Sequence, residues 1–215
     1  NMEARLNDPE MLPQIKKEII KNFERAGGPE GLLIASFKGD PGLEGKNFAE
    51  ISKEINKPLE ETAVWLILNG NPSIVSFNMK ESDVINFMKK DYVMTCSDGH
   101  IFNPGPSKPH PRNYGTFTRK IRKYVIDDQV ISMEHAIRAA TSLPAEMTGL
   151  KNRGRLKEGM KADIVIFNPD TVRDKATFED PHQYSEGIDY VLVNGNVVIE
   201  KGEYNGKLAG EHIKM

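Results

Sequence analysis

The alternation of helical patterns with short apolar runs in roughly the first hundred residues constrains the fold of this sequence most strongly. Apolar residues recur at steps of three and four through residues 9–26, which predicts a helix, and further helical patterns lie within residues 48–68. The runs at residues 32–37 and 74–77 are apolar and of strand length. Repeated helix and strand of this kind is typical of the α/β fold class, in which helices connect parallel strands.

Helical periodicity also returns in the middle of the sequence. Ser82 can cap one helix and Ser132 another, because a serine side chain accepts hydrogen bonds from the free backbone amides of the first turn. A further helix is expected over residues 116–126, and a short one after Pro144. These elements continue the α/β pattern up to about residue 148.

A strand-like run at residues 92–96 ends at Ser97-Asp98-Gly99, and residues 97–112 contain four prolines and two glycines. This composition predicts a long loop, and long loops in compact domains are often functional. Residues just past the C-terminal end of a parallel strand face the active-site mouth. Asp98 is therefore a candidate proton acceptor or metal ligand. The alternative is that it only caps a turn, since Ser-Asp-Gly is ordinary turn chemistry.

Arg112, at the far end of this loop, is the second candidate. Its guanidinium can clamp a carboxylate through two parallel hydrogen bonds, whereas the commoner use of an arginine is on a solvated surface. His110 and Cys96 are weaker candidates for metal contact. His110 would more commonly be exposed or bonded to backbone, and Cys96 would more commonly be a buried, inert residue at a strand end. The five histidines form no pair at two-, three- or four-residue spacing, so we expect no local zinc cluster.

Beyond residue 150 the pattern changes to β. Residues 163–167 form an apolar run, and residues 190–193 meet residues 197–199 across Asn194-Gly195-Asn196. Asn-Gly between apolar runs is a strong hairpin signal. We therefore expect an α/β domain over residues 1–148 and a small β module over residues 149–215.

The charge balance argues against some partners. A net charge of -2 and a pI near 6.3, with cations and anions interspersed, predict no nucleic-acid partner. The sequence lacks an apolar run of about eighteen residues and a signal-peptide pattern, so we expect no membrane partner. A single cysteine, Cys96, is compatible with the cytoplasm.

Several stretches, read in order, resemble one family, the N-acyl-D-amino-acid deacylases (D-aminoacylases) of the amidohydrolase superfamily. The motifs Pro-Arg-x-Tyr-Gly-Thr-Phe and Phe-x-Asp-Pro-His-Gln-Tyr, at residues 111–117 and 178–184, are similar to this family specifically. The stretch Gly-x-x-x-x-Gly-x-x-Ala-Asp at residues 154–163 and the final Val-x-Val-x-Gly at residues 191–195 resemble amidohydrolases in general. The resemblance extends over nearly the whole chain.

The resemblance implies a fold and a chemistry. The fold is the terminal part of an amidohydrolase TIM barrel followed by a small β-sandwich module. Asp98 corresponds to the catalytic base, which takes a proton from a metal-activated water while the resulting hydroxide attacks the acyl carbonyl. It is also a candidate ligand of the metal. Arg112 corresponds to the residue that holds the α-carboxylate of the N-acyl-D-amino acid, the small-molecule partner.

Family members are about twice as long and begin their barrel with a His-x-His metal pair that this sequence lacks. We therefore expect a C-terminal part of a zinc-dependent deacylase, with zinc in the parent enzyme and none in this chain, and no activity of the chain alone. Two alternatives stay open. One is a metal-free binding or regulatory module, and the other is self-association through exposed barrel edges.

Overall fold

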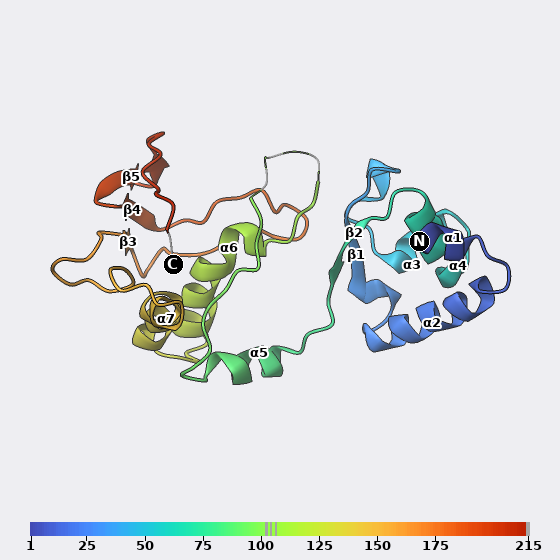
Figure 1. The fold of residues 1–215 in the computed structure, drawn as a ribbon, viewed down its shortest axis with the longest axis horizontal. Coiled ribbons are helices and arrows are strands. Elements are labelled where there is room, and N and C mark those ends of the chain that lie inside the picture. Colours follow the sequence, from blue (N-terminus) through green and yellow to red (C-terminus); the bar gives the residue numbers. More distant parts are fainter. Residues whose placement is uncertain (102, 104, 106, 214–215) are drawn as a thin grey trace. The chain divides into compact units, whose positions relative to one another are not determined.

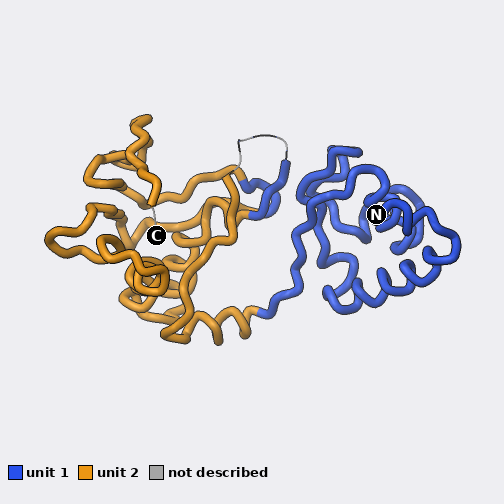
Figure 2. Tube along the Cα trace, in the orientation of Figure 1, with its two compact units in different colours: residues 1–80, 102–110, 178–181 blue, residues 81–101, 111–177, 182–215 orange. Residues whose placement is uncertain are grey.

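The computed structural model describes residues 1–101, 103, 105 and 107–213, in two compact units (Figure 2). Unit 1 comprises residues 1–80, 102–110 and 178–181. Unit 2 comprises residues 81–101, 111–177 and 182–215.

Unit 1 packs helices against a short two-stranded antiparallel sheet (Figure 1). Its elements are α1 (Met2–Leu6), α2 (Leu12–Arg25), β1 (Leu32–Ser36), α3 (Phe48–Glu54), α4 (Leu59–Leu68) and β2 (Ser73–Ser76), with 3-10 turns at Pro29–Gly31 and Pro41–Leu43. The core consists of apolar residues from the helices, from β1 and from the segment that follows it: Phe23, Ile34, Phe37, Leu43, Phe48, Ile51, Ala63 and Leu66. The helices and strands expected from periodicity in residues 9–77 are thereby confirmed.

Local signals fix the ends of these elements. Helix α3 begins at a capping box, in which the Asn47 side chain accepts from the Glu50 amide and the Glu50 carboxylate accepts from the Asn47 amide. The loop between α2 and β1 begins at Gly27 and Gly28, whose φ values of 82° and 100° lie in the left-handed region that favours glycine.

Unit 2 contains a helical part and a sheet. Its helices are α5 (Glu81–Met88), α6 (Arg112–Arg119), a π-helix (Lys120–Asp127) that continues α6, α7 (Met133–Ala140) and α8 (Ser142–Met147). Its strands are β3 (Ile164–Phe167), β4 (Ile188–Val193), β5 (Asn196–Glu200) and β6 (Glu203–Tyr204). They form one antiparallel sheet in the order β3-β4-β5-β6.

The expected hairpin is confirmed between β4 and β5. Asn194 and Gly195 have φ values of 50° and 79°, the two positive values that a type I′ turn requires, and Asn-Gly is the dipeptide that adopts them most readily. The Asn194 side chain donates to the Ala209 carbonyl, which ties the C-terminal segment to the turn. Ser132 caps α7 as expected, accepting from the His135 amide at 3.2 Å.

Three features expected for the barrel and the sandwich are not found among the described residues. Residues 92–96 form no strand, and β1 pairs with β2 antiparallel rather than parallel. A barrel strand is stabilised by hydrogen bonds to a neighbour on each side, and residues 92–96 have no strand neighbour in the described part of the chain. The described residues from 149 onward contribute one sheet, β3–β6, so the expected sandwich is not confirmed.

Two helix boundaries also differ. Ser82 lies inside α5 rather than capping it, and the helix expected over residues 116–126 begins four residues earlier, at Arg112. None of the helices in the described residues is both long and apolar enough to cross a membrane.

Candidate active site

Asp98 presents its carboxylate to solvent. Its backbone φ of 46° is in the left-handed region, which aspartate tolerates better than most residues, and its amide lies 3.4 Å from the Cys96 sulfur. The side chain is 80% exposed. The loop therefore displays Asp98 rather than burying it.

Arg112 is the first residue of α6 and pairs directly with Asp98. One guanidinium nitrogen, Nη2, lies 2.8 Å from Asp98 Oδ2, and the Arg112 side chain is 41% exposed. The structure thus brings together the two residues that the sequence singled out, fourteen positions apart. The pair is open to solvent on the side of the aspartate, where water and salt screen its charges.

A second contact holds this loop against α6. The His100 amide donates to Asn113 Oδ1 at 2.7 Å, one residue beyond Arg112. Gly99 lies so close to the helix that a Cβ on it would be 3.0 Å from the same oxygen. This contact is tighter than an ordinary van der Waals contact, so a side chain in place of Gly99 would require Asn113 or Ser97 to shift by a few tenths of an ångström.

The rest of the Pro-Arg-x-Tyr-Gly motif anchors α6 within unit 2. The Tyr114 hydroxyl lies 2.8 Å from Nδ1 of His182, and its ring also packs edge-on against Tyr184, with centroids 5.6 Å apart. Burial raises the pKa of Tyr114, so the phenol stays protonated and able to donate. The two deacylase-like motifs, at residues 111–117 and 178–184, thus contact each other.

Gly115 permits a close approach between α6 and the segment around Asp174. A Cβ at this position would lie 2.7 Å from the Asp174 Cβ. Asp174 also accepts from Arg119 at 3.2 Å, and Thr118 exchanges a hydrogen bond of 2.6 Å with Ser185. These contacts fix the orientation of α6 and, with it, the position of Arg112.

Thr95 holds the segment that leads to Asp98. Its amide donates to the Ala139 carbonyl at 2.8 Å, and its hydroxyl accepts from Lys120 Nζ at 2.6 Å. Burial lowers the pKa of Lys120, which is the first residue of the π-helix. Residues 92–96 are therefore held by side-chain and helix-end contacts in place of strand pairing.

The residues described do not make a metal centre by themselves. No group of three His, Cys, Asp or Glu side chains able to hold a metal ion occurs among them. Cys96 is exposed rather than buried, and His110 stacks edge-on against Phe178, with centroids 5.0 Å apart. Asp98 offers one carboxylate where a metal site needs three or more ligands, so a zinc ion does not fit these residues alone.

Residues 87–199, more than half of the chain, match the model of the Amidohydrolase family. The chain belongs to the amidohydrolase family. It is 38% identical over 184 residues to N-acyl-D-aspartate deacylase of Alcaligenes xylosoxydans xylosoxydans, which covers 86% of this chain and 36% of the relative. The amidohydrolase chain thus spans little more than a third of that protein.

Solved structures give the same assignment. A crystal structure of D-aminoacylase superposes with a TM-score of 0.75 and 36% identity, covering 83% of this chain and 36% of that one. The N-acyl-D-glutamate deacylase from Bordetella bronchiseptica, complexed with zinc and a phosphonate mimic of the tetrahedral intermediate, gives 0.73 and 33% identity, covering 82% and 36%. The resemblance inferred from the motifs is therefore confirmed, and the fold is of the amidohydrolase type.

Sequence reasoning did not identify the residues that support the pair. Asn113, Tyr114, Gly115 and His182 were seen only as letters of two motifs, without partners. The sequence offered one indication, because both motifs are specific to the same family. Two such motifs are consistent with residues that serve the same site. Nothing in their spacing shows that Tyr114 and His182, 68 residues apart, form a hydrogen bond.

Proposed function

We propose that this amidohydrolase chain supplies the catalytic base, Asp98, and the carboxylate clamp, Arg112, of a zinc-dependent N-acyl-D-amino-acid deacylase. The observation that carries the proposal is the ion pair between these two residues, in an amidohydrolase fold whose relatives are N-acyl-D-amino-acid deacylases. Residues 1–148 would belong to its barrel part and residues 149–215 to its β module.

The pair has the chemistry that amide hydrolysis needs from a protein. Asp98, as a carboxylate, accepts the proton of the attacking water while the water oxygen bonds to the acyl carbon. The proton then passes to the leaving nitrogen as the C–N bond breaks, which yields a carboxylate and a free amine. Arg112 would hold the α-carboxylate of the amino-acid half and so fix which side of the scissile bond faces Asp98.

Competition between carboxylates is central to this proposal. An exposed ion pair contributes only about 0.2–1 kcal/mol, because water and salt screen it. A substrate carboxylate that meets the guanidinium with two parallel hydrogen bonds can displace Asp98 from Arg112. Substrate binding would thereby release the base at the moment when it is needed.

The proposal places zinc outside the described residues of this chain. They provide no set of three ligands that could hold the ion. When present, zinc would polarise the acyl carbonyl and activate water. The purified 215-residue chain should accordingly bind no stoichiometric zinc and should not hydrolyse N-acetyl-D-amino acids. Turnover by this chain that Asp98→Asn abolishes would contradict the proposal.

A hybrid enzyme tests the clamp. The aligned part of the Alcaligenes N-acyl-D-aspartate deacylase is replaced by this chain, and hydrolysis of N-acetyl-D-aspartate is measured. Arg112→Gln should raise KM at least about tenfold, since a charged hydrogen bond to substrate is lost. Arg122→Gln, in the π-helix that continues α6 and paired with Asp127, is the control and should leave KM within about twofold. Equal effects of the two variants would count against the assignment.

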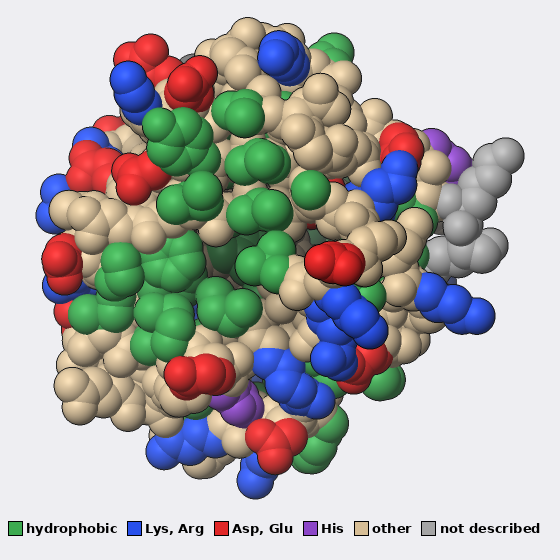
Figure 3. Space-filling view, turned by 90° about the vertical axis from the view of Figure 1, so that its left-hand side faces the viewer, with side chains coloured by type: hydrophobic (Ala, Val, Ile, Leu, Met, Phe, Trp, Pro, Cys, Tyr) green, Lys and Arg blue, Asp and Glu red, His purple; other side chains and the backbone are tan. Residues whose placement is uncertain are grey.

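Self-association is a second candidate role, favoured by the apolar surface of unit 2. Figure 3 shows hydrophobic side chains gathered around a hollow on one face. A groove of about 610 Å³ is lined by apolar residues of α7, β3 and the segment between them, including Ile137, Leu156 and Val165. Leu156 is 81% exposed and Val165 55%. If copies pair through this face, light scattering should give twice the 24.1 kDa mass, and Val165→Glu should restore the monomer.

A further inference from the structure

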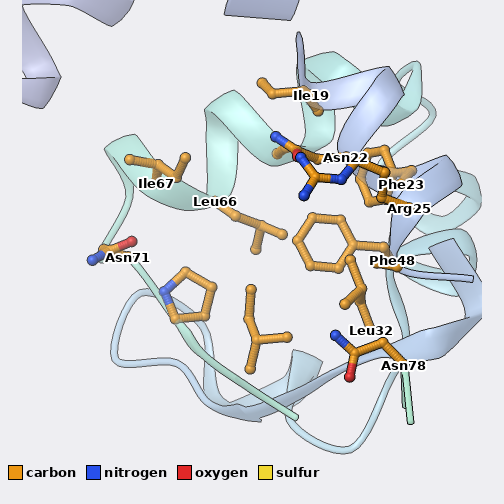
Figure 4. A pocket seen from close by; sticks show the side chains of 14 residues that line it. Ile19, Asn22, Phe23, Arg25, Leu32, Phe48, Leu66, Ile67, Asn71 and Asn78 are labelled. Atoms are coloured by element: carbon orange, nitrogen blue, oxygen red, sulfur yellow. The ribbon is translucent and has the colours of Figure 1, made fainter. Parts of the chain in front are cut away.

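Unit 1 contains an open pocket that the proposed chemistry does not use. It has a volume of about 540 Å³ and lies among α2, α3, α4 and the β1–β2 sheet (Figure 4). All of its lining residues belong to unit 1. Concave sites of this size, apolar with a few polar groups, are typical of small-molecule binding.

The floor of the pocket is apolar and rigid. Phe23 and Phe48 pack edge-on with ring centroids 5.3 Å apart, and Leu66 beside them is 1% exposed. All three belong to the core cluster of unit 1. The wall on the side of the β1–β2 sheet is formed by Leu32 and Ile74. Ile74 is 45% exposed although it is a large aliphatic side chain. An apolar body placed here would cover surface that now faces water.

The rim is polar and has one charge. Asn22 and Arg25 lie on the last turn of α2, and Figure 4 shows both side chains directed into the pocket, with Asn78 on another side. Arg25 is the single charged residue among those that line the pocket. In the described part of the chain its guanidinium forms no ion pair within 4.0 Å, whereas Arg112, Arg119 and others do.

This combination defines a class of ligand. A guanidinium without an acidic neighbour in the pocket attracts an anion, and its planar fork matches a carboxylate. The Asn22 amide adds a neutral donor on the same helix. Because Arg25 is the sole cation of the lining, a monoanion is balanced there and a phosphate dianion is not. The apolar floor requires the rest of the ligand to be hydrocarbon.

We propose that this pocket binds a monocarboxylate with an apolar body, its carboxylate on Arg25 and Asn22 and its hydrocarbon part over Phe48 and Leu66. The site is separate from Asp98 and Arg112 in the chain and does not depend on the deacylase function. It assigns to unit 1 a binding role for amphipathic monocarboxylates.

Octanoate is the probe that tests the pocket on the full 215-residue chain. Its affinity is measured by calorimetry, and the binding site by amide shifts in NMR spectra. Octanol lacks the charge and acetate lacks the apolar body, so both should bind at least about tenfold more weakly than octanoate. The NMR signals of backbone amides in α2, α4 and the β1–β2 sheet should shift when octanoate binds. Equal affinity for octanol and octanoate, or no octanoate binding up to about 10 mM, would overturn the proposal.

Matched variants separate the pocket from general attraction of an anion to helix α2. Arg25→Gln should weaken octanoate binding at least about tenfold. Lys17→Gln removes a charge from an exposed position of the same helix that does not line the pocket, and it should change affinity less than about twofold. Ile74→Glu, which places an anion on the wall, should weaken binding as strongly as Arg25→Gln. Equal loss in Arg25→Gln and Lys17→Gln would refute the site.

Discussion

The free energy that couples Asp98 to Arg112 distinguishes a functional pair from a structural one. We expect a double-mutant cycle with Asp98→Asn, Arg112→Gln and both together to give a coupling energy below about 1 kcal/mol in unfolding. The pair has good geometry, with 2.8 Å between Nη2 and Oδ2. Its exposure, not its distance, decides the magnitude.

At 2.8 Å, two unit charges in bulk water attract by about 1.5 kcal/mol before salt and side-chain entropy are counted. Holding two flexible side chains in one geometry opposes this attraction, and salt screens it further. The aspartate is 80% exposed, so neither charge is desolvated enough to strengthen the interaction. The remainder is small enough for a substrate carboxylate to displace Asp98.

The cycle is measured by urea unfolding of the four proteins, followed by circular dichroism at low and at high salt. The coupling energy should fall towards zero at high salt. A coupling above about 2 kcal/mol that persists in high salt would show that the pair anchors the fold. That result would refute the inference that Arg112 exchanges Asp98 for substrate.

Three further outcomes follow from the packing and the titration of other residues. Ile51→Ala, in the core of unit 1 at 0% exposure, should cost about 2–5 kcal/mol of unfolding free energy in urea titrations. Gly115→Ala should cost about 1–3 kcal/mol by overpacking α6, whereas Gly210→Ala, with open space around it, should be neutral in the same assay. A hydrogen bond from Tyr124 lowers the pKa of Glu81 below its ordinary 4.5. The ionised carboxylate therefore stabilises the fold above pH 4.5, and this stabilisation is lost as the pH falls through the lowered pKa. Glu81→Gln should lower the free energy of unfolding at neutral pH. In acid, below the lowered pKa, the variant and the parent should have equal free energies of unfolding.

Elements with local signals were predictable from the sequence. The apolar spacing of α2, the Ser132 cap of α7 and the Asn194-Gly195 turn each depend on residues within a few positions, and the structure has all three. Residues 92–96 have the composition of a strand but form none, because strand formation depends on neighbours that are remote in sequence. The antiparallel pairing of β1 and β2 was missed for the same reason.

In the candidate site, too, features that depend on local sequence could be predicted and contacts between remote residues could not. Asp98 and Arg112 could be proposed from the sequence because each stands at an end of one loop and corresponds to a residue of the deacylase family. Their ion pair and the Tyr114–His182 hydrogen bond were not, since each depends on the three-dimensional path of the chain between the two residues. A motif thus identified the residues, and the structure was needed to show which of them touch.

The kcat of the hybrid deacylase with Asp98→Asn tests the central claim most directly. If Asp98 is the base, kcat for N-acetyl-D-aspartate should fall by about a hundredfold or more, while the fold and the zinc content of the hybrid are unchanged. Asp91→Asn, an exposed carboxylate seven residues earlier, should leave kcat within about twofold. A hybrid that retains its kcat after Asp98→Asn would contradict the assignment of Asp98 as the catalytic base.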